Sequence, residues 1–103
     1  MTVLTDKNFK EIVEEGNELF VIDLYADWCA PCRMLAPTLA ELELEYPSAS
    51  FCKINVDDQP SLAAQFHVES IPMVAFVKND TFLDFTVGVL SKDELASKIR
   101  EYL

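Results

Sequence analysis

The chain has few glycines, few basic residues and a single histidine. Two of its 103 residues are glycine, and eight Lys and Arg stand against eighteen Asp and Glu, so the formal net charge is -10. A surface of this sign repels a nucleic-acid backbone and an anionic membrane, and we expect neither as a partner. Basic patches on protein partners would suit it, although the acidity could equally serve only to keep a small abundant protein in solution.

Long apolar runs, linkers and repeats are also missing. No run approaches the ~20 apolar residues of a transmembrane helix. Met1 leads into a short strand-like pair, Val3 and Leu4, without the basic segment and apolar core of a secretory leader, and we therefore expect a cytoplasmic protein. The length predicts one domain, over residues 1–103, that is large enough to bury a core.

Cysteine is scarce as well. The three cysteines include one C-x-x-C pair, and an odd count of this kind is a poor disulfide framework, which fits a reducing compartment. A C-x-x-C pair can also be half of a zinc site, which needs two further ligands. Only Cys52 and His67 remain for that role, singly and without the usual second pair, so we expect no metal and no cofactor.

The apolar pattern that is present predicts alternating helices and strands. The spacing of Phe9, Ile12 and Val13 before Gly16 predicts a first helix. Residues 19–26 are too continuously apolar for a half-exposed strand and are typical of one covered on both faces, as in a parallel sheet.

The later elements follow from the same reasoning. We predict a helix with the apolar stripe Leu35, Leu39, Leu42 and Tyr46 and a kink at Pro37. A buried strand over 51–56 and a short helix opened by Asp58-Gln59-Pro60 follow. We then predict a strand over 73–77, a hairpin turn at 78–81, a strand with Leu83, Phe85 and Val87 on one face, and a capping box at 91–94 before a last amphipathic helix. This order gives a βαβ half and a ββα half. The predicted fold class is therefore α/β, with a central mixed sheet flanked by helices on both faces.

The two paired cysteines fall where the first buried strand stops and the next helix starts. Backbone N–H groups in a first helical turn lack intrahelical partners and carry the positive end of the helix dipole, which favours a thiolate. Open α/β sheets place their sites at this carboxyl edge. We predict Cys29 as the nucleophile, with Cys32 close enough, after tightening of the first turn, to form a reversible disulfide across Pro31.

Two charged residues interrupt the buried strands. Asp23 lies six residues before Cys29 among apolar neighbours, where burial would raise its pKa and let it exchange a proton with Cys32; a solvent-facing Asp at a strand edge is the alternative. Lys53 lies in the second buried strand, and Asp23 is its expected partner. We expect Cys52 to pack as a small hydrophobe and His67 to lie on the surface.

Ile71-Pro72 precedes the third strand. A proline there marks a strand start, a sheet edge or a cis bond, and the sequence alone leaves these open.

The ordered pattern of these residues resembles the thioredoxin family across nearly the full length. It consists of Asp23 within residues 21–28, Cys-Ala-Pro-Cys-Arg at 29–33, then Lys53, Ile71-Pro72 and Gly88. A C-x-x-C pair alone would be weak, whereas one beside a βαβ pattern is typical of this family.

The resemblance implies a thioredoxin fold and a protein disulfide reductase in which Cys29 attacks, Cys32 resolves, Asp23 accepts a proton and Lys53 tunes that acid. It implies that Pro72 is cis and faces the disulfide. It also implies an electron supply from thioredoxin reductase, clients such as peroxiredoxins or other reductases, and a monomer. The residues implied in substrate binding are Trp28, Ala30, Pro31, Ile71, Pro72, Met73, Gly88 and Val89.

The chain departs from the family pattern at several positions. Ala30 replaces a usual Gly between the cysteines, and Met73 replaces a common Thr, which we expect to enlarge the apolar contact surface. His67, Ser70 and Asp80 stand where glycines are frequent, and a positive φ at Asp80 would need the tolerance that asparagine has for this conformation. A disulfide isomerase or oxidant is the nearest alternative, against which Pro31 in place of His argues, and a redox-silent docking module is a second one.

Overall fold

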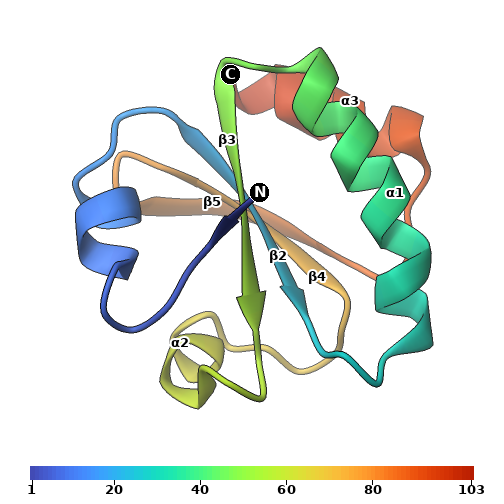
Figure 1. Cartoon of the computed structure of the whole chain (residues 1–103). Helices are drawn as coiled ribbons and strands as arrows, with labels where there is room; N and C mark the ends of the chain where they lie inside the picture. Colours follow the sequence, from blue (N-terminus) through green and yellow to red (C-terminus); the bar gives the residue numbers. More distant parts are fainter.

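The computed structural model describes all 103 residues and contains a five-stranded mixed sheet in the order β1-β3-β2-β4-β5 (Figure 1). Strands β1, β3 and β2 are mutually parallel, whereas β4 pairs antiparallel with both β2 and β5. The elements are β1 (Thr2–Val3), a π-helical turn η1 (Lys10–Glu14), β2 (Leu19–Tyr25), α1 (Ala30–Glu45), β3 (Ala49–Asn55), α2 (Pro60–Gln65), β4 (Met73–Lys78), β5 (Thr81–Val87) and α3 (Lys92–Tyr102).

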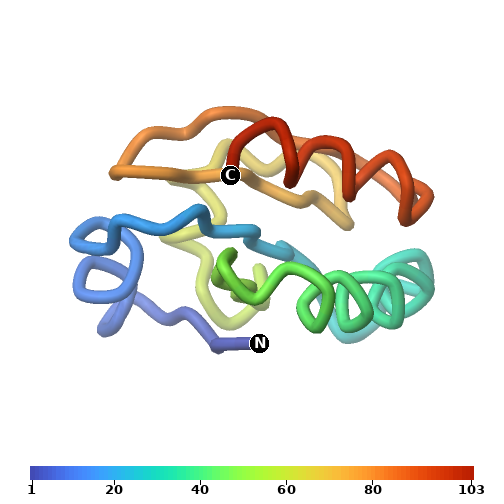
Figure 2. Tube along the Cα trace, turned by 90° about the horizontal axis from the view of Figure 1, so that it is seen from above, coloured from blue at the N-terminus to red at the C-terminus, as the bar shows by residue number.

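Helices cover both faces of the sheet, as the sequence predicts. Figure 1 shows α1 and α3 on one side and α2 with the N-terminal turn on the other. In Figure 2 the N-terminal segment and α1 lie opposite the β4–β5 hairpin and α3, with β2 between them. This arrangement is the predicted βαβ half joined to a ββα half.

Strand β2 is buried on both faces because its side chains alternate between two cores. Leu19 and Val21 pack with α1 and α3, whereas Phe20, Ile22 and Leu24 pack with the opposite cluster. Asp23 follows Val21 by two residues and so faces the α1 side. The sheet therefore places a carboxyl group beneath the helix that carries the cysteines.

Helix α1 begins where the sequence predicts. Cys29 is its N-cap, and the Cys29 sulfur accepts a hydrogen bond from the backbone N–H of Cys32 at 3.2 Å. Pro31 lies in the first turn, where a missing N–H leaves no bond unmade, and the helix continues through Pro37 to Glu45.

The predicted first helix is present only as the single π-helical turn η1. Gly16 follows it, and a Cβ there would lie 2.5 Å from Cζ of Phe20 and 2.6 Å from the carbonyl oxygen of Ile12. Glycine is required at this position by close approach of the chain, because only a residue without a Cβ fits.

The hairpin between β4 and β5 has the turn that the sequence predicts. Asn79 and Asp80 adopt φ of 51° and 58°, the two left-handed residues of a type I′ turn, and His67 is left-handed as well with φ of 54°. Asn and Asp tolerate this conformation better than most residues. Asp80 thus has the positive φ that requires this tolerance.

The predicted apolar face of β5 is wrong at one residue. A β-bulge shifts the register, so that Phe82 pairs with Val77 while Asp84 pairs with Phe76. The bulge puts Phe82, rather than Leu83, beside Phe85, with ring centroids 6.1 Å apart. Phe82, Phe85 and Val87 then line a hollow of about 730 Å³ together with the last residue of α2 and the segment that follows it.

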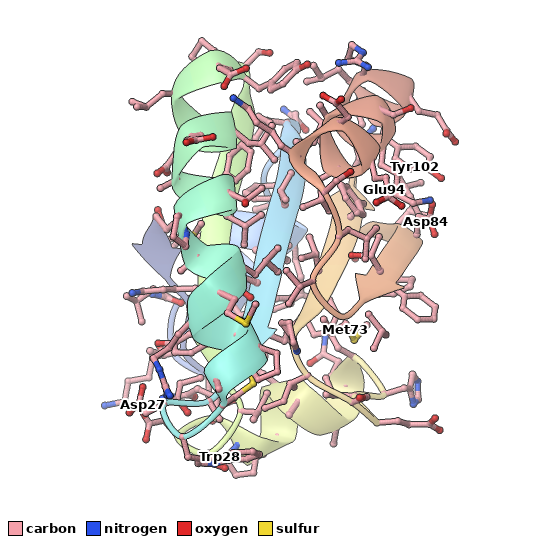
Figure 3. All side chains as sticks on the ribbon, turned by 90° about the vertical axis from the view of Figure 1, so that its right-hand side faces the viewer. Asp27, Trp28, Met73, Asp84, Glu94 and Tyr102 are labelled. Carbon is pink, nitrogen blue, oxygen red and sulfur yellow. A yellow bond between two sulfur atoms is a disulfide. The ribbon has the colours of Figure 1, made fainter.

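Helix α3 is fastened to β5 through Asp84 (Figure 3). The Tyr102 hydroxyl donates to the Asp84 carboxylate at 2.9 Å, and Lys98 pairs with the same oxygen at 2.6 Å. The hydrogen bond from Lys98 lowers the pKa of Asp84, so this carboxylate stays charged and holds the helix. No helix in the structure has the length and apolar character needed to cross a membrane.

The capping box of α3 allows a stability test. The Ser91 hydroxyl accepts from the Glu94 N–H at 3.2 Å, and the Glu94 carboxylate accepts from the Ser91 N–H at 3.1 Å. We expect Ser91→Ala to lower the unfolding free energy by about 1 kcal/mol in urea denaturation. Ser97→Ala, an exposed change within the same helix, is the control, and equal loss in both variants would contradict the role of the cap.

Candidate active site

The two paired cysteines form a disulfide at the start of α1. Cys29 and Cys32 have Cα atoms 5.3 Å apart, and each is only 4% exposed. The N–H of Cys32, which as a donor of the first helical turn has no partner within the helix, points at the sulfur of Cys29. Such donors stabilise negative charge, so the fold provides for a thiolate at Cys29 when the pair is reduced.

Trp28 lies beside the disulfide at the end of the molecule where α1 begins (Figure 3). Its side chain is 70% exposed, yet its indole N–H donates to the Asp57 carboxylate at 2.8 Å. Asp57 follows β3, so this hydrogen bond joins two segments that are far apart in the sequence. The sequence analysis missed Asp57; its signal was an acidic residue at the carboxyl end of the neighbouring strand.

A groove of about 380 Å³ runs next to the disulfide. Its lining comes from the start of α1 with the two residues before it and from the loop before β4. Five of the predicted site residues meet there: Trp28, Cys29, Ala30, Pro31 and Ile71, with Glu69 and Ser70 completing it. Glu69 and Ser70 also line the hollow beside β5. The groove therefore lies directly against Cys29.

The Ile71-Pro72 bond is cis and directly precedes β4. The carbonyl oxygen of Pro72 accepts from the N–H of Gly88 at 2.9 Å. Gly88 has φ of 93°, a conformation that only glycine adopts readily, and this turn brings the chain after β5 against Pro72. Val89 follows with an exposed side chain outside the groove.

Met73 does not enlarge the exposed contact surface as expected. Its side chain is 3% exposed and packs in the core cluster on the α2 side of the sheet. It lies at the first position of β4, where the register with Leu24 turns it inward. Pro72 is buried as well, so the exposed apolar rim consists mainly of Trp28 and Val89.

Asp23 is buried, which excludes the solvent-facing alternative. It is 7% exposed, and its Oδ1 atom has no hydrogen-bond partner. Burial raises the pKa of Asp23 to about 6, although the charge of Lys53 opposes the rise. A carboxyl group with this pKa both holds and releases a proton near neutral pH.

Lys53 lies next to Asp23 in the sheet but does not pair with it as expected. The parallel register places the two residues opposite each other, yet the Lys53 Nζ atom lies 5.7 Å from the centre of the Tyr25 ring. None of the four ion pairs of the structure involves either residue. The sequence identified the neighbours correctly and the contact wrongly, because Tyr25 lies on the same face and offers a competing partner.

A hollow of about 390 Å³ is bordered by the buried acid and by the second cysteine of the pair. Asp23, Lys53 and Cys32 all line it, and Tyr25 forms another part of its wall. The Cys32 side chain and the Asp23 carboxyl group therefore border the same space.

The third cysteine and the histidine behave as predicted. Cys52 is 1% exposed, and burial raises the pKa of its thiol to about 12, which leaves it unreactive. His67 lies on the surface. No three side chains of His, Cys, Asp or Glu come together as a metal-binding group.

Comparisons with known proteins give a consistent result. The Thioredoxin family model matches residues 1–101. Thioredoxin of Chlorobaculum thiosulfatiphilum is 37% identical over 100 residues, covering 96% of this chain and 93% of that protein. Thioredoxin of Staphylococcus saprophyticus subsp. saprophyticus is 41% identical over 101 residues, covering 97% and 95%.

The fold comparison agrees. A chain from a study of the structural basis of the thiol resolving mechanism in yeast mitochondrial 1-Cys peroxiredoxin via glutathione/thioredoxin systems superposes with a TM-score of 0.89 and 30% identity. The match covers 98% of this chain and 94% of that chain. The fold is therefore shared over almost the whole length of both chains.

The chemistry of the pair fits this family. Two cysteines that close into a disulfide at a helix start can give two electrons to a disulfide in another protein when they are reduced. Thioredoxins reduce the disulfides of client proteins and act with thioredoxin reductase. This chain belongs to the thioredoxin family and is a thiol-disulfide oxidoreductase.

Proposed function

We propose that Cys29 is the attacking thiolate and Cys32 the resolving thiol of a protein disulfide reductase. The Cys29 thiolate attacks one sulfur of a client disulfide, a mixed disulfide forms, and the other client sulfur leaves as a thiolate. Cys32 then loses its proton and attacks the Cys29 sulfur. The internal disulfide closes, the client leaves with both sulfurs reduced, and two electrons have passed to it.

In this proposal Asp23 accepts the proton of Cys32. The observation that carries the proposal is the hollow shared by Asp23 and Cys32, in which Oδ1 of the buried carboxyl group has no hydrogen-bond partner. Lys53 adjusts the acid through its charge, which lowers the pKa that burial raises. Proton transfer by a positioned group of this pKa is effective near neutral pH.

Client chains dock, in the same proposal, along the groove beside the disulfide. The groove is lined by Trp28, Ala30, Pro31 and Ile71, and the buried Pro72 and Met73 with Gly88 and Val89 shape the chain segments around it. Exposed Trp28 is the largest apolar surface at this edge. Large aromatic side chains commonly supply much of the binding free energy of an interface.

This docking role is tested with Trp28→Ala. Losing the indole is expected to raise KM for a protein client on the order of tenfold while kcat changes little, because the ring contacts the client and not the reacting sulfurs. Met34→Ala removes another exposed apolar side chain, 66% exposed on α1 and outside the groove, and is the control. A larger fall in kcat than rise in KM would contradict the assignment.

The partners are proposed from the family. We infer that a thioredoxin reductase returns electrons to the Cys29–Cys32 disulfide and that peroxiredoxins or other reductases are among the clients. The similarity to a chain studied with a yeast peroxiredoxin supports the second of these. We place this chemistry in a monomer and in the cytoplasm, where thiols are kept reduced.

Two measurements test the proposed function as a whole. Reduced protein should cleave the interchain disulfides of insulin, and thioredoxin reductase with NADPH should sustain the reaction. A reduction potential below that of the glutathione pool would identify a reductant. A potential well above it would identify an oxidant or isomerase instead.

A further inference from the structure

Lys53 has two possible partners on the α1 face of the sheet. Asp23 and Tyr25 are two residues apart on β2 and therefore point to the same side. Lys53, on the neighbouring strand β3, lies opposite Asp23 in the register of the sheet. The ammonium group lies over the Tyr25 ring, 5.7 Å from its centre, and makes no ion pair with Asp23. The cation nearest to the buried acid is thus held by an aromatic ring.

The choice between these partners matters because their effects on Asp23 differ. The face of an aromatic ring attracts an ammonium group without neutralising it. In its observed position Lys53 only moderates the effect of burial, and the pKa of Asp23 remains about 6. A direct ion pair would lower the pKa of a carboxyl group by roughly 1 to 3 units and leave it ionised at neutral pH.

The other cationic groups that line this hollow are the Met1 amino group and Arg33, and both are already engaged; its other carboxylates are Asp27 and Glu43. The amino group of Met1 pairs with Glu43 at 3.2 Å. The Arg33 guanidinium donates to the carbonyl oxygen of Asp27 at 2.6 Å. Strand β4 faces Asp23 with the apolar Val74. Lys53 is therefore the cation of this hollow that makes neither an ion pair nor a side-chain hydrogen bond.

We propose that Tyr25 is a positioning residue, whose ring holds the Lys53 ammonium away from Asp23 and so keeps that buried carboxyl group able to hold a proton close to neutral pH. The consequence for thiol exchange rests on the proposed role of Asp23 as the proton acceptor of Cys32. The positioning itself does not, since it concerns only where the ammonium group lies.

The test is a ¹³C NMR titration of the Asp23 carboxyl group in the disulfide form, in which Cys29 and Cys32 do not titrate. Tyr25→Leu removes the ring, and the Asp23 midpoint is expected to fall by roughly one pH unit as Lys53 moves to the acid. Tyr25→Phe keeps the ring and is the matched control, with a midpoint like that of the parent. An unchanged midpoint in Tyr25→Leu would overturn the proposal.

Water entering beside a smaller side chain could lower the same midpoint, so the series is repeated with Lys53→Met. In that background Tyr25→Leu is expected to leave the Asp23 midpoint unchanged, because no ammonium group remains to be released. An equal fall in both backgrounds would mean that the ring acts by excluding water, and the positioning role would be rejected.

A kinetic readout separates this proposal from the proposed function. The pH profile for resolution of a mixed disulfide on Cys29 should shift in Tyr25→Leu together with the Asp23 midpoint. A shifted midpoint with an unshifted profile would support the positioning of Lys53 and overturn the role of Asp23 as proton acceptor.

Discussion

Cys29→Ser is expected to abolish disulfide reduction, whereas Cys32→Ser is expected to retain the first attack and accumulate client protein bound to Cys29. The two cysteines occupy different positions at the start of α1, and the Cys29 sulfur lies at the N-cap among unpaired N–H donors. Without Cys29 no thiolate is stabilised there, so turnover of insulin should fall to the uncatalysed rate. Turbidity assays and mass spectrometry of the adduct measure the two effects.

Cys52→Ala is the control for both variants. This thiol is buried with a raised pKa, and its loss should leave the reduction rate unchanged. An adduct found on Cys52, or undiminished cleavage by Cys29→Ser, would contradict the assignment. A redox-silent docking module would keep its function in a Cys29→Ser, Cys32→Ser double variant, whereas a reductase loses it.

Asp23→Asn is expected to remove a loss of about 3 kcal/mol in unfolding free energy that the parent protein undergoes as the pH rises. Burial raises the pKa of Asp23 from 3.8 to about 6. Below the pKa that Asp23 has in the unfolded state, the carboxyl group is protonated in both states, and the free energy of unfolding is not reduced. Between the two values the folded protein binds the extra proton, so stability falls as pH rises, and above about pH 6 the full loss of about 3 kcal/mol applies.

The asparagine variant lacks this decline. Its unfolding free energy relative to the parent should therefore rise by about 3 kcal/mol between pH 3 and pH 8, whatever constant cost the buried amide adds. Denaturant midpoints of the disulfide forms measure it. Asp27→Asn, an exposed carboxylate on the same hollow, is the control and should follow the parent.

The same substitution should slow catalysis although it raises the unfolding free energy at high pH relative to the parent. Without its proton acceptor Cys32 should resolve mixed disulfides about a hundredfold more slowly at pH 7, the low end of what a positioned acid or base contributes. A variant with parental rates and a parental pH dependence of stability would show that Asp23 is an ordinary carboxylate.

Local signals were sufficient for most of the fold. The continuous apolar run of β2 required cover on both faces, and two clusters provide it. The capping box at Ser91 and the left-handed Asn79 and Asp80 depend on groups within four residues of one another, so their chemistry can be recognised before any packing is known. The N-terminal helix was the exception, present as a single π-helical turn.

The core of the site was also predictable. A C-x-x-C pair after a buried strand places one sulfur at a helix start, and a carboxyl group on that strand lies beneath it because strand side chains alternate in a fixed direction. The order of Asp23, Cys29, Cys32 and Pro72 then indicated the family, which the comparisons confirm.

By itself the sequence determined that β2 is covered on both faces, where α1 begins and which family the chain belongs to, since these depend on periodicity and neighbouring residues. Only the tertiary structure decided which side chain of a distant segment each of these residues contacts. Lys53 contacts Tyr25 rather than Asp23, Trp28 is held by Asp57, and Met73 is buried. The reason is competition: several partners lie within reach of each side chain, and register, bulges and burial select among them only when the whole sheet has formed.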